Sequence, residues 1–99
     1  MIPTSVRIFV CEQPQDMRRS FDGLSVAARE HLDEDPQSGA LFVFINRRKN
    51  RAKVMWFEEN GYCLLYKRLD RARFTVPGSR TISGHALAVL LRGVPTRRT

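Results

Sequence analysis

The sequence is poor in the residues that carry metal or covalent chemistry. Its 99 residues include two cysteines and two histidines. Cys11 and Cys63 lie far apart in the chain, form no CxxC pair, and are interpreted as buried thiols in a reducing compartment. His31 and His85 have no further histidine, cysteine or carboxylate at the spacing of a metal site. We therefore predict no metal, no cofactor and no catalytic residue.

Long apolar runs and the common phosphate-binding or hydrolase motifs are also absent. The longest apolar run, Ala40–Ile45, has the length of a strand, whereas a membrane-spanning helix needs about 20 apolar residues. The segment Met1–Ser5 has neither the charged nor the apolar region of a signal peptide. No Walker A, GxSxG or HExxH motif occurs, and Asp33–Asp35 lack the spacing of a calcium loop. We expect a cytoplasmic, nucleoid-associated protein that is not an enzyme and does not bind membranes.

Positive charge is concentrated in the second half of the chain. The net charge of +7 divides into −3 over residues 1–46, +6 over residues 47–73 and +4 over residues 74–99. A polyanion is therefore an expected partner, docking on the second half. The alternative is that the basic charge serves only solubility.

The apolar pattern predicts one small α+β domain over residues 1–95, in the order β-α-β-β-β-α, with a basic tail at 96–99. A strand is expected over 5–10, and a helix capped by Asp16 should follow, with Arg18 and Asp22 paired along its side. Residues 40–45, 51–57 and 62–69 form a β-meander. Ser83 caps a second helix that ends at Gly93, and Val94 belongs to its buried side. The sheet is expected to be largely antiparallel, with two packed helices.

The register of the central hairpin is predicted from its turn. Asn60–Gly61 is a preferred pair for a two-residue type I′ turn. Such a turn places Glu59 opposite Tyr62, and it carries Lys53 opposite Arg68 further along the strands. Alternation then gives two faces that are both too apolar to be simply solvated. One should be covered by a helix, and the other should meet the second helix, another subunit or a ligand.

A nucleic-acid interface is the binding site that the basic segment favours. Phosphate contacts need cations at fixed places, and a rigid turn with a strand behind it supplies them. The aromatic side chains nearby are more typical of core packing than of base stacking, and no sequence-specific recognition motif is visible. The predicted nucleic-acid-binding residues are Arg47, Arg48, Lys49, Arg51, Lys53, Lys67, Arg68, Arg71 and Arg73.

Several sequence words, in the same order and spacing, carry a family resemblance from about Val6 to Gly93. They are Asp16-Met17-Arg18-Arg19, Phe21-Asp22-Gly23-Leu24, Ser38-Gly39, Leu41-Phe42-Val43-Phe44, Asn46-Arg47-Arg48, Lys53 with Trp56, Gly61, Tyr66-Lys67-Arg68-Leu69, Arg73-Phe74, Pro77 and Leu90-Leu91-Arg92-Gly93. The chain resembles the small TnpB-type accessory proteins encoded by the second open reading frame of bacterial insertion sequences of family sixty-six. These proteins are distinct from the RNA-guided nucleases that are also called TnpB.

The resemblance implies a role in transposition beside a separately encoded DDE transposase, with DNA binding suggested. The expected partners are thus DNA, either element ends or non-specific duplex, and the cognate transposase. Two hypotheses remain open at this point. One is a noncatalytic DNA-binding accessory protein. The other is a protein-interaction adaptor or homo-oligomer that uses the surplus apolar sheet face without touching DNA.

Overall fold

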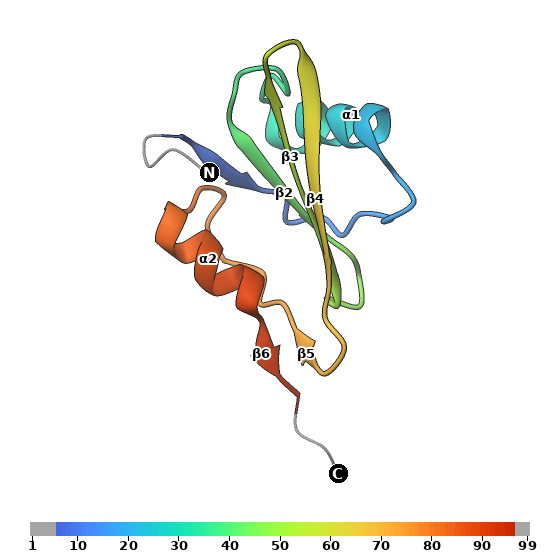
Figure 1. Cartoon of the computed structure of the whole chain (residues 1–99), viewed down its shortest axis with the longest axis vertical. Helices are drawn as coiled ribbons and strands as arrows, with labels where there is room; N and C mark the ends of the chain where they lie inside the picture. Colours follow the sequence, from blue (N-terminus) through green and yellow to red (C-terminus); the bar gives the residue numbers. More distant parts are fainter. Residues whose placement is uncertain (1–5, 97–99) are drawn as a thin grey trace.

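A four-stranded sheet lies between two helices, and a small two-stranded sheet follows it (Figure 1). The computed structural model describes residues 6–96. Its elements are β1 (Ile8–Val10), α1 (Phe21–Leu32), β2 (Leu41–Ile45), β3 (Arg51–Glu58), β4 (Gly61–Arg68), β5 (Ala72–Arg73), α2 (Gly84–Arg92) and β6 (Val94–Pro95).

The sheet is largely antiparallel, as predicted. Its order is β1-β2-β3-β4, with β1 parallel to β2 and the other neighbours antiparallel. The predicted α+β class is confirmed, and the six predicted elements occur in the predicted order as β1, α1, β2, β3, β4 and α2. The short antiparallel pair of β5 and β6 was not predicted. No helix within residues 6–96 has the length and apolar character needed to cross a bilayer.

Both faces of the central strands are buried because each face is covered by one helix, whereas β4 is half-buried to exposed. All five residues of β2 are buried, which explains its unbroken apolar sequence. One cluster joins α1 to the sheet and includes Leu24, Ala28, Leu32, Phe42, Phe44 and Met55. The other joins α2 to the opposite face and includes Val43, Ile45, Val54, Leu87 and Leu90. Cys11 is buried as predicted, whereas Cys63 is only half-buried.

The predicted hairpin register is wrong by two residues. The turn residues are Glu59 and Asn60, both at positive φ (47° and 67°), and Gly61 already belongs to β4. Lys53 therefore lies opposite Tyr66 rather than Arg68. This register places a buried ammonium against an aromatic ring 4.8 Å away instead of against a second cation. Because the shift is even, the residues predicted for each face remain on that face.

Helix α1 begins four residues later than its predicted first turn. Asp16 does not cap it; its carboxylate instead accepts hydrogen bonds from the backbone and side chain of Arg18, at 2.8 Å and 2.6 Å. The expected Arg18–Asp22 pair is therefore replaced by an Arg18–Asp16 pair. The Lys53 ammonium takes up the carbonyls of Met17 and Arg19, which a helix would have used for its own hydrogen bonds.

The two ends of α2 follow the prediction. Ser83 Oγ accepts a hydrogen bond from Ala86 N at 3.0 Å, and Gly93 ends the helix with φ of 73°. A Cβ at Gly93 would lie 2.5 Å from the Leu69 side chain, so only glycine fits between the helix and the end of β4. Val94 was predicted on the buried side but is 58% exposed, because it has left the helix for β6.

The structure describes only part of the predicted first strand and of the predicted tail. The first strand is shorter than its predicted range of 5–10, since only residues 8–10 pair with β2, and residue 5 lies outside the described residues. In the predicted 96–99 tail, Thr96 N donates to Arg71 O at 2.9 Å, and residues 97–99 lie outside the described residues.

Candidate nucleic-acid interface

The turn between β2 and β3 holds its cations on a rigid backbone. Asn46 Oδ1 accepts hydrogen bonds from the backbone N–H groups of Asn50 and Arg51, both at 3.0 Å. The Asn46 backbone donates to Arg51 O at 3.0 Å and accepts from Lys49 N at 3.1 Å. Arg47, Arg48 and Lys49 are exposed on this closed loop. Asn46 therefore fixes the backbone of this turn through its side chain and main chain, and the three cations that the turn carries are held at fixed places.

The segment after β4 lies against the same turn. Leu69 N donates to Asn50 O at 2.8 Å, and Phe74 N donates to Lys49 O at 2.7 Å. The two intervening cations, Arg71 and Arg73, are thus brought beside the turn, although Arg73 is half-buried and bonds Ala72 O. Five of the predicted cations come together here through backbone pairing that sequence distance alone does not show.

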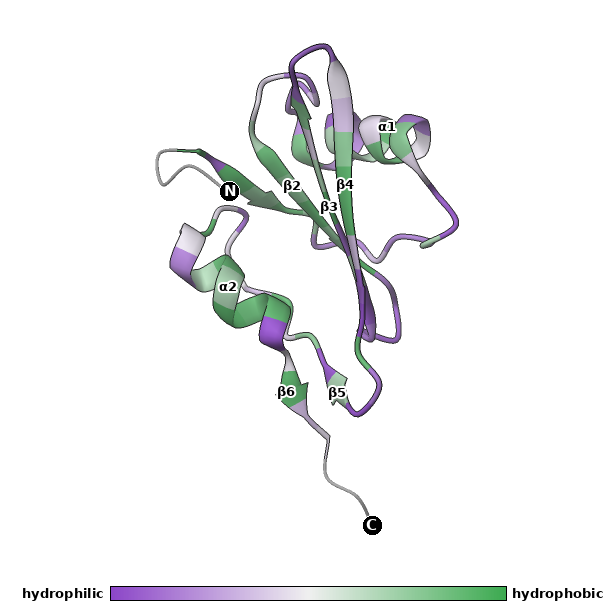
Figure 2. Cartoon of the chain, in the orientation of Figure 1, coloured by the Kyte–Doolittle hydropathy of each residue, from purple (hydrophilic) through white to green (hydrophobic). Residues whose placement is uncertain are grey.

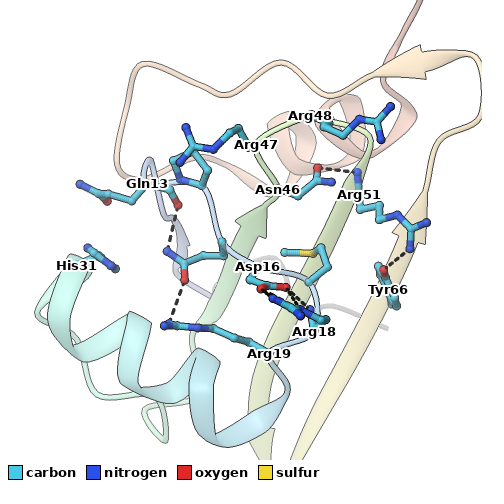
Figure 3. A pocket seen from close by; sticks show the side chains of 13 residues that line it. Gln13, Asp16, Arg18, Arg19, His31, Asn46, Arg47, Arg48, Arg51 and Tyr66 are labelled. Atoms are coloured by element: carbon cyan, nitrogen blue, oxygen red, sulfur yellow. Dashed lines mark hydrogen bonds and ion pairs between the residues drawn. The ribbon is translucent and has the colours of Figure 1, made fainter.

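Five arginines surround one open depression of about 910 Å³ on the α1 side of the sheet (Figure 3). Arg47 and Arg48 come from the turn and Arg51 from the start of β3, while Arg18 and Arg19 come from the loop before α1. The remaining lining residues are Gln13, Pro14, Gln15, Asp16, Met17, His31, Asn46 and Tyr66. Asp16 is the one carboxylate in this lining, so the depression carries a strong excess of positive charge.

Hydrogen bonds shape the floor and wall of the depression. The buried Gln15 donates to Gln13 O at 3.2 Å and accepts from Arg19 at 3.3 Å, and its backbone N–H donates to Ile45 O at the end of β2. On the other wall Arg51 donates to the Tyr66 hydroxyl at 2.9 Å. Within residues 6–96, no ion pair or hydrogen bond engages the side chains of Arg47 and Arg48. Their guanidinium groups are free to meet an anion.

Lys53 supports the depression from below instead of lining it. It is 6% exposed, and its ammonium donates to the carbonyls of Met17 and Arg19, both at 2.7 Å. The Tyr66 ring covers it at 4.8 Å. Lys53 thereby fixes the loop that presents Arg18 and Arg19, and it is not placed to contact a phosphate.

Asp16 and Arg18 form an exposed ion pair within the depression. Hydrogen bonds from the Arg18 side chain and then from its backbone lower the pKa of Asp16 to about 2. Asp16 is therefore ionised at neutral pH and holds Arg18, whose side chain is otherwise 91% exposed. An anion entering the depression competes with this carboxylate for the Arg18 guanidinium.

The structure divides the nine predicted residues into three groups. Arg47, Arg48 and Arg51 line the depression. Lys49, Arg68, Arg71 and Arg73 are not in its lining: Lys49 lies in the turn, Arg71 and Arg73 lie in the segment that pairs with the turn, and Arg68 lies at the end of β4, where it pairs with Asp70. Lys67 lies opposite Ala52 and faces the α2 side, and Lys53 is buried.

Sequence reasoning missed Arg18, Arg19 and His31, because they belong to the segment with a net charge of −3. The adjacent pair of arginines just before a helix was the available clue. His31 lies on the last turn of α1 and closes one side of the depression, whereas His85 is exposed on the first turn of α2. Desolvation raises the pKa of both thiols, and the neighbouring Glu58 carboxylate raises that of Cys63 further, so both thiols are protonated at neutral pH.

The chain is similar over its whole length to proteins of the same size. "Uncharacterized protein y4hO" of Sinorhizobium fredii is 39% identical, with 98% of this chain and 90% of the relative covered. "Uncharacterized protein y4jC" of the same organism is 31% identical, with 94% and 83% covered. No solved structure matches. The family described as IS66 Orf2 like protein matches residues 6–99, and the chain belongs to this insertion-sequence family.

Proposed function

We propose that this protein is a noncatalytic accessory factor of insertion-sequence transposition that binds DNA through the arginine depression. Family membership supports the association with transposition. The observation that carries the DNA-binding part is the convergence of five arginines on one open depression beside a rigid turn. Guanidinium groups bind phosphate oxygens bidentately, so a fixed array of them suits a nucleic-acid backbone.

Three of the sequence words that carry the family resemblance meet at this depression. Asp16 to Arg19 form one wall, Asn46 to Arg48 form another, and Tyr66 to Arg68 end the strand that passes beside Arg51. The cations of this surface come from three separate elements, so their placement depends on the tertiary fold. Contacts of this kind bind the phosphate backbone and do not by themselves read a base sequence.

The direct test is a titration of element-end duplex and of scrambled duplex at two salt concentrations, read by electrophoretic mobility or anisotropy. The variant Arg47→Gln/Arg48→Gln removes two phosphate contacts, and we expect the slope of log affinity against log salt to fall by about 2. The variant Arg29→Gln/Arg92→Gln is the matched control, since it removes two exposed arginines on α1 and α2.

Equal losses in the two double variants would contradict the site and indicate a general effect of net charge. Unchanged binding in a folded Arg47→Gln/Arg48→Gln variant would contradict it as well. Binding to neither duplex by the unaltered chain would favour the adaptor hypothesis, in which the cognate transposase is the main partner.

A further inference from the structure

Strand β4 is an open edge of the sheet, whereas the opposite edge is closed. On the β1 side, Val10 N donates to Arg80 O at 2.8 Å and Ile82 N donates to Ile8 O at 3.1 Å. Within residues 6–96, β4 pairs with β3 alone. It pairs over its full eight residues without a bulge, so its outer side offers a continuous row of unpaired backbone groups about 27 Å long. Edge strands are commonly shortened, bulged, charged or covered, and within residues 6–96 the only such device on β4 is the charge of Lys67 and Arg68 at one end.

Apolar side chains flank this edge on both faces. On the α1 face Tyr62 stacks on Phe21, with ring centroids 6.1 Å apart, and Phe21 is itself 40% exposed. On the α2 face Leu65 is 39% exposed and borders an apolar groove of about 620 Å³ that Trp56 also lines. A strand added at this edge would therefore bury apolar surface above and below the sheet as well as satisfying backbone groups.

The charges at the two ends of β4 indicate which strand can pair with this edge. Glu58 at the end of β3 and Glu59 in the turn lie at one end of β4, and Lys67 and Arg68 occupy the other end. The β3–β4 turn and the far end of β4 are both hydrophilic in Figure 2. A second β4 running antiparallel brings the acidic end of each copy to the basic end of the other. A parallel arrangement would bring like charges together. The edge is thus complementary to itself in one orientation.

We propose that β4 pairs antiparallel with β4 of a second copy of this chain, which joins two four-stranded sheets into one. The twofold axis of such a pair is perpendicular to the sheet, so each face of one copy continues into the same face of the other. Both α1 helices then lie on one side of the joined sheet. If the depression binds DNA as proposed above, the dimer presents two depressions on the same side, and one duplex can engage both.

The first experiment measures molar mass by size exclusion with light scattering at high micromolar concentration. The expected mass is twice the chain mass of 11.4 kDa. Leu65→Lys places a charge beside the edge, and the mass should fall to that of one chain. Val89→Lys is the matched control, because Val89 is 45% exposed on α2, away from β4, and this variant should keep the doubled mass. Circular dichroism confirms that both variants are folded.

The second experiment tests the orientation by exchanging charges. Lys67→Glu and Glu59→Lys each create like-charge contacts at both ends of the antiparallel pair, so each variant alone should be monomeric. Mixing the two variants restores opposite charges at both ends, and the doubled mass should return. Glu58 is left unchanged because its carboxylate accepts a hydrogen bond from Trp56 at 2.8 Å.

A monomeric wild-type chain would overturn the proposal and leave the edge to a strand of another protein. A dimer unaffected by Leu65→Lys would overturn the assignment to β4. A mixture that stays monomeric would overturn the antiparallel arrangement. The DNA titration is separate, because Arg47→Gln/Arg48→Gln leaves the edge intact and should change DNA binding without changing the mass.

Discussion

Lys53→Met should destabilise the protein strongly, although it removes a buried charge that has no carboxylate partner among the described residues. Methionine keeps the apolar stem of the side chain in place but leaves the carbonyls of Met17 and Arg19 without their donor. A hydrogen bond from a charged donor contributes about 1.5–3 kcal/mol. Because both hydrogen bonds are only partly buried, we take the lower end for each, which gives a loss of about 3 kcal/mol in the free energy of unfolding.

For a chain of this size the loss corresponds to a fall in Tm of at least about 10 °C. Thermal and urea unfolding followed by circular dichroism measure it. Arg29→Met is the matched control, since Arg29 is an exposed cation on α1 outside both the depression and the β4 edge, and its effect should stay within about 0.5 kcal/mol. If the two variants unfold at the same temperature, Lys53 does not hold the loop before α1. Because Lys53→Met also frees the loop that carries Arg18 and Arg19, this variant should bind DNA more weakly.

Four further changes test other parts of the structure. Arg18→Gln should return the pKa of Asp16 from about 2 toward its ordinary 3.8, measured by NMR titration; in the unaltered chain the stabilising contribution of this pair is complete above pH 3.8 and is lost as the pH falls toward 2. Asp16→Asn should free Arg18 and tighten DNA binding, and weaker binding in the titration would refute the competition between carboxylate and phosphate. Ser83→Ala should lower the free energy of unfolding by about 1 kcal/mol through the lost cap of α2, as read from urea unfolding. Gly93→Ala should be destabilising by more than about 1 kcal/mol in the same assay because of its positive φ and close packing, whereas Gly78→Ala, with open space around it, should not.

Sequence reasoning predicted the elements and the two faces of the sheet because both depend on local periodicity. An alternation of period two assigns Met55 and Val54 to opposite faces whatever the pairing. The register of the β3–β4 hairpin could not be predicted in this way. The preference of Asn60–Gly61 for a turn is local and small, whereas the register also depends on packing along eight paired residues, including the position of Lys53 against Tyr66.

Only part of the candidate site was predicted from the sequence, for a similar reason. The net charge of each segment pointed to Arg47 and Arg48. In the first segment the acidic residues outnumber the basic ones, so the net charge there concealed Arg18 and Arg19. The pairing of Gln15 with the end of β2 and the hydrogen bonds of Lys53 to the loop bring it beside the turn, and both are tertiary contacts. Lys53 was assigned to the interface because burial of a lysine under a loop leaves no trace in the sequence pattern.

The closure of the β1 edge has a consequence for how the chain folds. Strands β2, β3 and β4 are joined by short turns, so their contacts close small loops and can form early. Strand β1 instead pairs Ile8 with Leu41 and Phe9 with Thr81, across 33 and 72 residues of chain. We expect β1 to dock last, and a chain still emerging from the ribosome lacks the segment that covers this edge. Until Thr81 and Ile82 are synthesised, the growing meander has two open edges instead of one.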